Sequence, residues 1–231
     1  MATRVQGGAA AGTTARREAG QPARPSARER LLASANELFY SEGVQTVGID
    51  RIIEHAGVAK ASLYNTFGNK EGLVRAYLES RRDRTRGRIA RAMTRYRTPR
   101  ERLLGVFESQ GEMFTDPDYN GCAFVSASAE AGADSAIAGE TDEYRAWMRG
   151  MFTDLSREAG AADPELLARQ LHLLYDGAML SARMDRDPTA ASTARAAAAV
   201  LLNATLPADR TDRADGADRP GGTGTAGPAA S

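Results

Sequence analysis

The chain has 231 residues, carries equal numbers of basic and acidic side chains (30 of each) and contains one cysteine, Cys122. One cysteine excludes an internal disulfide and any metal site that needs several cysteines. No run of 18 apolar residues offers a membrane span, and the first 25 residues lack the apolar stretch of a secretory signal. We therefore expect a cytoplasmic protein without membrane, metal or cofactor.

The balanced net charge hides an uneven distribution along the chain. Residues 1–97 hold 18 Lys and Arg against 9 Asp and Glu, and the remaining residues hold 12 against 21. A basic half is typical of a region that faces a polyanion. Five arginines of this half, however, fall in one short stretch (81–88), and they could instead lie on a solvated helix face. Charge alone leaves both interpretations open.

Helix signals fill the chain between its two ends. Residues 1–25 and 207–231 are rich in Gly, Ala, Arg and Pro without apolar periodicity, which predicts disordered tails. Capping-box sequences begin at Ser26 and Thr98, and Asp-Pro steps begin at Asp163 and Asp187. No segment alternates with period two, so we expect an all-α fold of about nine helices. Their predicted ranges are 27–42, 49–56, 60–66, 70–95, 99–115, 122–132, 140–159, 164–185 and 189–205.

The segment 49–67 predicts a helix-turn-helix. Two short helices flank Gly57, which supplies the left-handed backbone that a sharp turn needs. Apolar side chains of both helices would pack on Leu38 and Phe39. The second helix turns short or polar groups outward, which suits the major groove: Lys for guanine, Asn for adenine and an Ala methyl for thymine. The alternative is a helical corner with no role in DNA binding.

The residues from Leu31 to Leu73 resemble the DNA-binding domain of the tetracycline-repressor (TetR) family. The resemblance rests on four groups at family spacing: Ala56-Gly57-Val58, Leu63-Tyr64, Phe67 and Lys70-Glu71-Gly72-Leu73. It implies an N-terminal three-helix helix-turn-helix domain (26–85) and a C-terminal helical domain (86–206) that binds a ligand and dimerises.

The resemblance also assigns DNA contacts to individual residues. It implies base contacts from Lys60, Ala61 and Ser62, and base or phosphate contacts from Tyr64, Asn65 and Thr66. Lys70 would bind phosphate at a helix N-terminus, where the backbone already attracts anions. The family often has Ser or Thr capping the second helix; this chain has Gly48, whose amide could still donate to phosphate.

Large apolar and aromatic side chains gather on the middle helices of the second half. Such a set is typical either of an ordinary core or of an adaptable ligand pocket. We expect a pocket for a mostly apolar ligand there. Its predicted lining is Phe107, Gln110, Phe124, Trp147, Met151, Phe152 and Tyr175.

The last two helices are apolar on more than one face, which predicts that a second subunit covers one of those faces. The predicted homodimer interface consists of Leu171, Leu174, Ala178, Ala198 and Leu201. The sequence thus predicts a repressor that leaves a palindromic double-stranded DNA operator when a small molecule binds. One alternative is a ligand-independent activator or architectural protein. An enzyme is disfavoured because no catalytic constellation is present.

Overall fold

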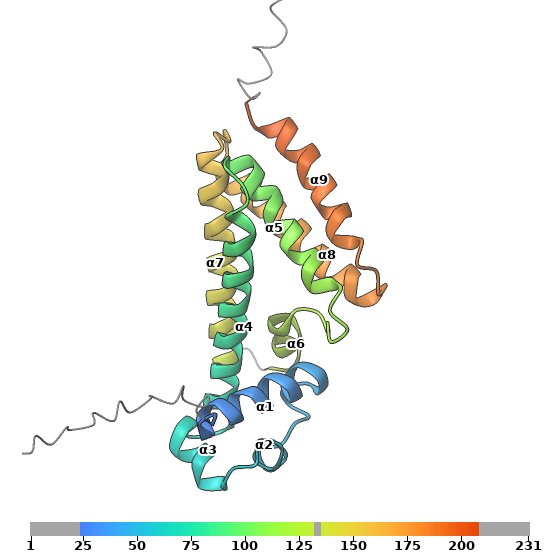
Figure 1. The fold of residues 1–231 in the computed structure, drawn as a ribbon. Coiled ribbons are helices and arrows are strands. Elements are labelled where there is room, and N and C mark those ends of the chain that lie inside the picture. The colour runs from blue at the N-terminus through green and yellow to red at the C-terminus, as the bar shows by residue number, and fades with distance from the viewer. Residues whose placement is uncertain (1–23, 132–134, 208–231) are drawn as a thin grey trace, which may run out of the picture.

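The computed structural model describes residues 24–131 and 135–207, and over these residues the chain forms nine α-helices and no strand (Figure 1). The predicted all-α fold is confirmed. The helices are α1 (Ala27–Glu42), α2 (Ile49–Ala56), α3 (Lys60–Phe67), α4 (Lys70–Met93), α5 (Pro99–Phe114), α6 (Ala123–Glu130), α7 (Ala136–Glu158), α8 (Pro164–Met184) and α9 (Ala190–Thr205). The expected tails lie outside the described residues, apart from residues 24, 25 and 207.

Side-chain caps fix where several helices begin. Glu29 N donates to Ser26 Oγ (3.2 Å) while Ser26 N donates to Glu29 Oε2 (2.7 Å), so the predicted capping box of α1 is confirmed. The box at Thr98 is confirmed in the same way. The cap predicted at Asp187 is wrong: α9 begins only at Ala190, and the Asp187 carboxylate accepts from the Thr189 amide instead (2.8 Å).

The helix α7 begins four residues earlier than the predicted range. Gly139 breaks the apolar pattern in the sequence, but Ile137, one turn before Thr141, is buried. Burial of that side chain against the core compensates for the poor helix propensity of glycine.

The helices form two connected parts (Figure 1). The first part is the small unit α1–α3. In the second, α7 packs on α8, and α9 packs on both α5 and α8. The long helix α4 belongs to both parts: near its start the Tyr77 ring meets Phe39 of α1 (5.5 Å between centroids), and further on Arg88 reaches Tyr175 of α8. The expected domain boundary at 85/86 falls inside this unbroken helix.

No helix in the described part of the chain combines the length and apolarity that crossing a bilayer requires.

Candidate nucleic-acid interface

The helix-turn-helix has the predicted geometry. Gly57 adopts a left-handed conformation (φ 60°, ψ 43°) between α2 and α3. Ile52 and Leu63 are fully buried, and they belong to the same core as Leu38 and Phe39. Sequence reasoning missed one support of the turn: Arg30 Nη1 of α1 donates to the Gly57 carbonyl (3.0 Å). Nothing in the local pattern around Arg30 signals this contact, because its partner lies 27 residues away.

The burial of Leu63 turns the opposite side of α3 to solvent. The predicted base-contacting side chains of Lys60 and Ala61 are exposed, and Ser62 is half-buried. Tyr64 is 44% exposed although it is a large aromatic residue. Asn65 and Thr66 are exposed as well, with the Thr66 hydroxyl donating to the Ser62 carbonyl (2.6 Å). The six predicted residues of α3 therefore lie together on one short helix.

Lys60 does not present a free charge. Its Nζ lies 2.8 Å from Oδ1 of Asp50 on α2, and both side chains are largely exposed. The hydrogen bond to Asp50 raises the pKa of Lys60. An acidic side chain on the proposed DNA-facing surface was not foreseen from the sequence, because α2 and α3 bring the pair together only after folding.

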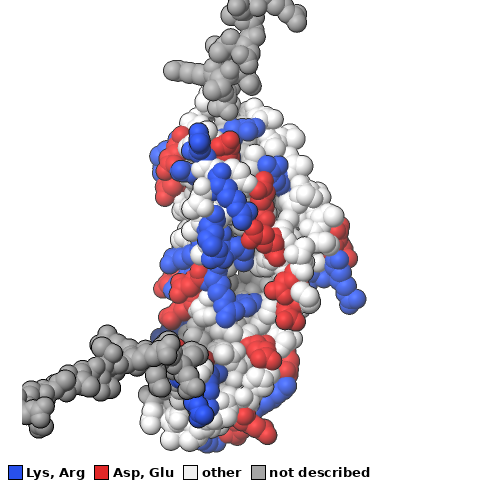
Figure 2. All heavy atoms as spheres, viewed as in Figure 1, with Lys and Arg blue, Asp and Glu red and all other residues white. Residues whose placement is uncertain are grey.

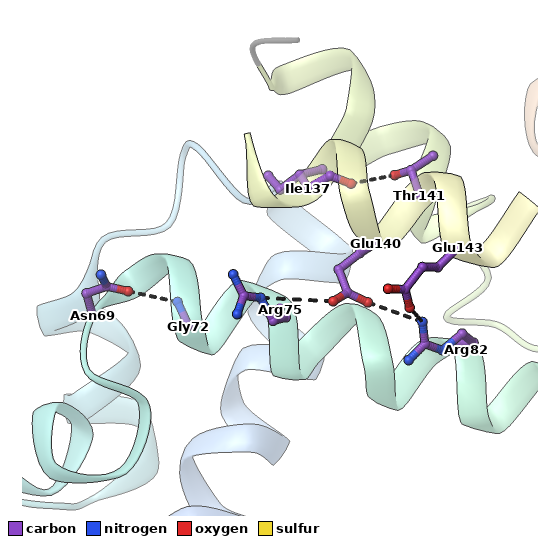
Figure 3. Close-up of polar contacts among 8 residues, drawn as sticks. All are labelled: Asn69, Gly72, Arg75, Arg82, Ile137, Glu140, Thr141 and Glu143. Atoms are coloured by element: carbon purple, nitrogen blue, oxygen red, sulfur yellow. Dashed lines mark hydrogen bonds and ion pairs between the residues drawn. The ribbon is translucent and has the colours of Figure 1, made fainter. Parts of the chain in front are cut away.

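Lys70 lies at the start of α4, where the Asn69 side chain caps the helix by accepting from Gly72 N (2.8 Å; Figure 3). Its Nζ donates to the Gln45 carbonyl (3.4 Å), and partial burial lowers the pKa of Lys70 while the Glu130 carboxylate opposes that shift. Gln45 N in turn donates to Glu130 Oε2 (2.7 Å) at the end of α6. The expected phosphate-binding lysine is thus linked through one loop residue to the second part of the molecule.

Gly48 is the N-cap of α2, in an extended conformation (φ −78°, ψ 156°) and with no side-chain cap. A Cβ at this position would meet nothing within 4 Å. The backbone therefore tolerates the Ser or Thr that the resemblance suggests, and the glycine is not required by the fold.

The excess of basic charge does not lie on the helix-turn-helix. Residues 26–77 carry six Lys and Arg and six Asp and Glu. Three arginines of α4 contact other parts of the protein: Arg82 pairs with Glu140 and Glu143 (Figure 3), Arg81 lies over the Tyr40 ring, and Arg86 lies over Trp147. Arg84 and Arg91 are exposed on the same helix, beyond residue 77. The uneven charge along the sequence therefore does not locate a DNA-binding surface.

Comparisons with known proteins agree with this geometry. The family model described as "Bacterial regulatory proteins, tetR family" matches residues 31–77. The chain is 33% identical over 86 residues to the HTH-type transcriptional activator FasR of Mycolicibacterium smegmatis, and 33% identical over 92 residues to the HTH-type transcriptional repressor KstR2 of the same organism. The matches cover 37% and 40% of this chain but only 39% and 44% of those two proteins.

Solved structures extend the likeness beyond the helix-turn-helix. A TetR-family transcriptional regulator from Streptomyces coelicolor superimposes with a TM-score of 0.73 at 31% identity, covering 78% of this chain and 95% of that one. A putative regulator from Streptomyces avermitilis gives 0.69 at 33% identity, covering 78% and 98%. The helix-turn-helix and these likenesses together identify a DNA-binding transcriptional regulator. The chain belongs to the TetR family.

Four of the predicted ligand-pocket residues form a tightly packed cluster. Phe107, Phe152 and Tyr175 are fully buried, with ring centroids 6.2–6.4 Å apart. Gln110 Nε2 donates to the Tyr175 carbonyl within this cluster (2.9 Å). Trp147 and Met151 are half-buried on α7. Phe124 lies apart from the cluster and stacks on Tyr144 (4.0 Å between centroids).

A cavity of about 920 Å³ lies elsewhere, between α1, α4, α6 and the segment that joins α5 to α6. Of the seven predicted pocket residues, Phe124 lines this cavity and the other six do not. Phe124 is thus the one predicted pocket residue in the lining of the cavity. The cavity also has residues of α1 in its lining, and so it reaches the DNA-binding part.

The predicted dimer interface needs correction. Leu171, Ala178 and Ala198 are buried inside the subunit itself, so a partner could not cover them. Leu174 and Leu201 are half-buried and line a groove of about 450 Å³ between α8 and α9. The large apolar side chains that this subunit leaves exposed on the two helices are Leu166, Leu173, Leu180, Met184 and Val200.

Proposed function

We propose that the protein is a homodimeric repressor that binds a palindromic operator and leaves it when a small molecule binds. The observation that carries the proposal is α3: this short helix, anchored by the buried Leu63, exposes five of the six predicted side chains, with Lys70 at the start of the next helix. That arrangement suits insertion into a major groove, with Lys70 at the adjoining phosphate.

The exposed face of α8 supports pairing with a second copy. Leu166, Leu173 and Leu180 follow one another at intervals of seven residues and are all exposed, as is Val200 on α9. Apolar residues at that spacing form a seam that packs against a second helix pair in a bundle. A twofold axis through this face would present two copies of α3, which matches the symmetry of a palindromic operator.

The relatives do not decide between repression and activation, because FasR is named an activator and KstR2 a repressor. The second candidate function is therefore a ligand-independent activator or architectural protein. Release by a ligand is supported by the position of the cavity, which α1 of the DNA-binding part and α6 of the second part both line. A ligand shifts DNA affinity only when it binds one arrangement of these parts better than the other.

DNA selection from a random library, followed by affinity measurements on the recovered sequence, tests the proposal. We expect Tyr64→Ala and Lys70→Ala to weaken binding at least tenfold, because each is placed at bases or phosphate. Lys70→Ala should also reduce the slope of log affinity against log salt by about 1. Arg91→Ala is the matched control, since Arg91 is an exposed cation of the same helix, nearly six turns from Lys70 by helical geometry at about 3.6 residues per turn.

Unchanged affinity and salt slope in both variants would contradict the proposed docking of α3. A reporter gene placed behind the recovered operator separates repressor from activator. Expression that rises when the protein is added would favour the second candidate.

A further inference from the structure

Three arginines on one face of α4 line the large cavity: Arg81, Arg84 and Arg88. Their spacing of three and four residues places them one above another along the helix. Within the described part of the chain, none of the three has an Asp or Glu within ion-pairing distance, whereas Arg82 on the neighbouring face pairs with two glutamates. Figure 2 shows basic side chains gathered in a column over α4.

The contacts of these arginines do not neutralise their charge. The Arg81 guanidinium lies over the Tyr40 ring (3.5 Å), and Arg88 donates to the Tyr175 hydroxyl (3.4 Å). Arg88 Nε is buried without a hydrogen-bond partner. Desolvation, and then the charge of Arg81, lower the pKa of Arg84. Like charges held together along one wall of the cavity, with Arg81 and Arg88 half-buried and Arg84 exposed, favour an anion that would pair with them.

The rest of the cavity is of mixed character. Apolar and aromatic groups come from Phe124, Tyr144, Met113 and Met179. Three acids also line it, but Glu37, Asp116 and Asp118 are all exposed, and Glu37 lies 3.6 Å from His55 outside the arginine row. The acids therefore lie toward solvent, as Arg84 does, while the half-buried Arg88 lies deeper, beside Tyr175.

We propose that this cavity binds an organic anion with an apolar body. A carboxylate or phosphate would lie against Arg84 and Arg88, since the guanidinium fork matches both groups, and the apolar body would lie against Phe124 and Met179. The volume of about 920 Å³ is within the range of pockets for small molecules. The inference rests on the proposed ligand response and names its chemical class: the ligand carries a negative charge that the apolar ligand expected from the sequence did not need.

Calorimetry on the full chain without DNA tests the charge requirement. The probes are octanoate and 4-phenylbutyrate, each beside its neutral amide, with phenyl phosphate added to separate phosphate from carboxylate recognition and inorganic phosphate as an anion without apolar body. We expect at least one organic anion to bind ten or more times tighter than its neutral amide or than inorganic phosphate.

The variants Arg84→Gln and Arg88→Gln should each weaken that anion about tenfold and leave the amide unchanged. Arg91→Gln, on the same helix but outside the cavity lining, should bind like the parent. Arg84→Gln keeps the test decisive if Arg88→Gln is unstable, because Arg84 donates no hydrogen bond to another described residue.

Equal binding of acid and amide, no binding of any probe, or an equal loss in Arg91→Gln would overturn the anion site. DNA affinity is measured separately with and without the bound probe. An anion that binds in the cavity without changing DNA affinity would support the site and contradict the proposed ligand response, so the two failures are distinguishable.

Discussion

Position 72 accommodates only glycine, because the first turn of α4 lies very close to the backbone at the end of α3. A Cβ at this position would lie 2.1 Å from the Phe67 carbonyl oxygen, which is backbone and cannot rotate away. We expect Gly72→Ala to lower the free energy of unfolding by about 1–3 kcal/mol, the usual cost of overpacking, as measured by urea denaturation. It should weaken DNA binding too, because α3 and Lys70 would have to move apart.

The matched control for this substitution is Gly150→Ala. Gly150 lies within α7, and a Cβ there meets nothing within 4 Å. Alanine is the better helix former, so this variant should gain up to about 1 kcal/mol. Equal effects of the two substitutions would show that the close approach at Gly72 carries no energetic weight.

We also predict that the ion pair between Asp50 and Lys60 weakens DNA binding. Asp50 partly neutralises a lysine that we place at base edges, and its own charge repels phosphate. We expect Asp50→Asn to tighten operator binding about three- to tenfold at low salt, with a smaller gain at high salt. Fluorescence anisotropy at two salt concentrations measures the change.

Asp154→Asn is the control for charge removal, since it breaks an exposed Arg157 pair of similar length (2.9 Å) on α7. It should leave DNA affinity unchanged. If Asp50→Asn behaves like this control, or weakens binding, Lys60 does not act as a free cation at the DNA.

At the scale of helices, α4 and α7 are joined by one mostly buried acid, Glu140 (Figure 3). Desolvation raises the pKa of Glu140 although Arg82 opposes the shift. The protonated form is therefore favoured by folding, and its contribution to stability is lost as pH rises from the ordinary value of 4.5 through the raised value.

Glu140→Gln mimics the protonated acid and keeps an oxygen for Arg82. We expect the stability of the parent, relative to this variant, to fall as pH rises from about 4 to 7, as measured by urea denaturation at each pH. A difference that grows in favour of the parent with rising pH would mean that the Arg82 pair outweighs desolvation.

Local patterns predicted most helices, because caps and turns act within a few residues. Ser26 with Glu29, Thr98 with Glu101, and the left-handed Gly57 all have the predicted geometry. The early start of α7 was missed because it depends on the burial of Ile137 against other helices. The family resemblance assigned DNA contacts to residues of α3, which periodicity alone could not do, because it left open a helical corner with no role in DNA binding.

Features that depend on distant contacts were not predictable. An apolar residue of α8 can pack inward or outward, and both faces of that helix read alike in the sequence. The sequence therefore predicted Leu171 at the dimer interface, but Leu171 is buried in the subunit. Leu173, which is 74% exposed, is the residue that we now propose for this interface. Likewise, an arginine run does not reveal which members pair with acids, and so the cavity beside Arg84 and Arg88 was not foreseen.

At the scale of the whole molecule, the exposed seam on α8 predicts the assembly. We expect the double variant Leu173→Glu, Leu180→Glu to sediment as a folded monomer, because it places charges at the centre of a face that must become dry. Its helix content by circular dichroism should stay unchanged. DNA affinity should fall sharply, since only one half-site is then held at a time.

Val125→Glu is the control, because Val125 is an apolar residue of α6 that is exposed (56%) away from this seam. It should remain a dimer. A double variant that sediments like the parent would place the interface on another face. Ala198→Glu is unsuitable for this purpose, since Ala198 is fully buried in the subunit and the variant would report on folding.

Because α4 is one unbroken helix, a small tilt at the cavity end would produce a larger displacement at the DNA end. Lys70 and Arg88 are 18 positions apart on one straight element, or about 27 Å at 1.5 Å per residue. A tilt of about 5° around the Arg88 end would carry Lys70 sideways by about 2 Å. If two subunits tilted in opposite directions, the distance between their α3 helices would change by about 4 Å. This is more than the rise of one base-pair step, which is about 3.4 Å. In the proposed dimer, a rotation this small would take the two α3 helices out of register with successive half-sites of the operator.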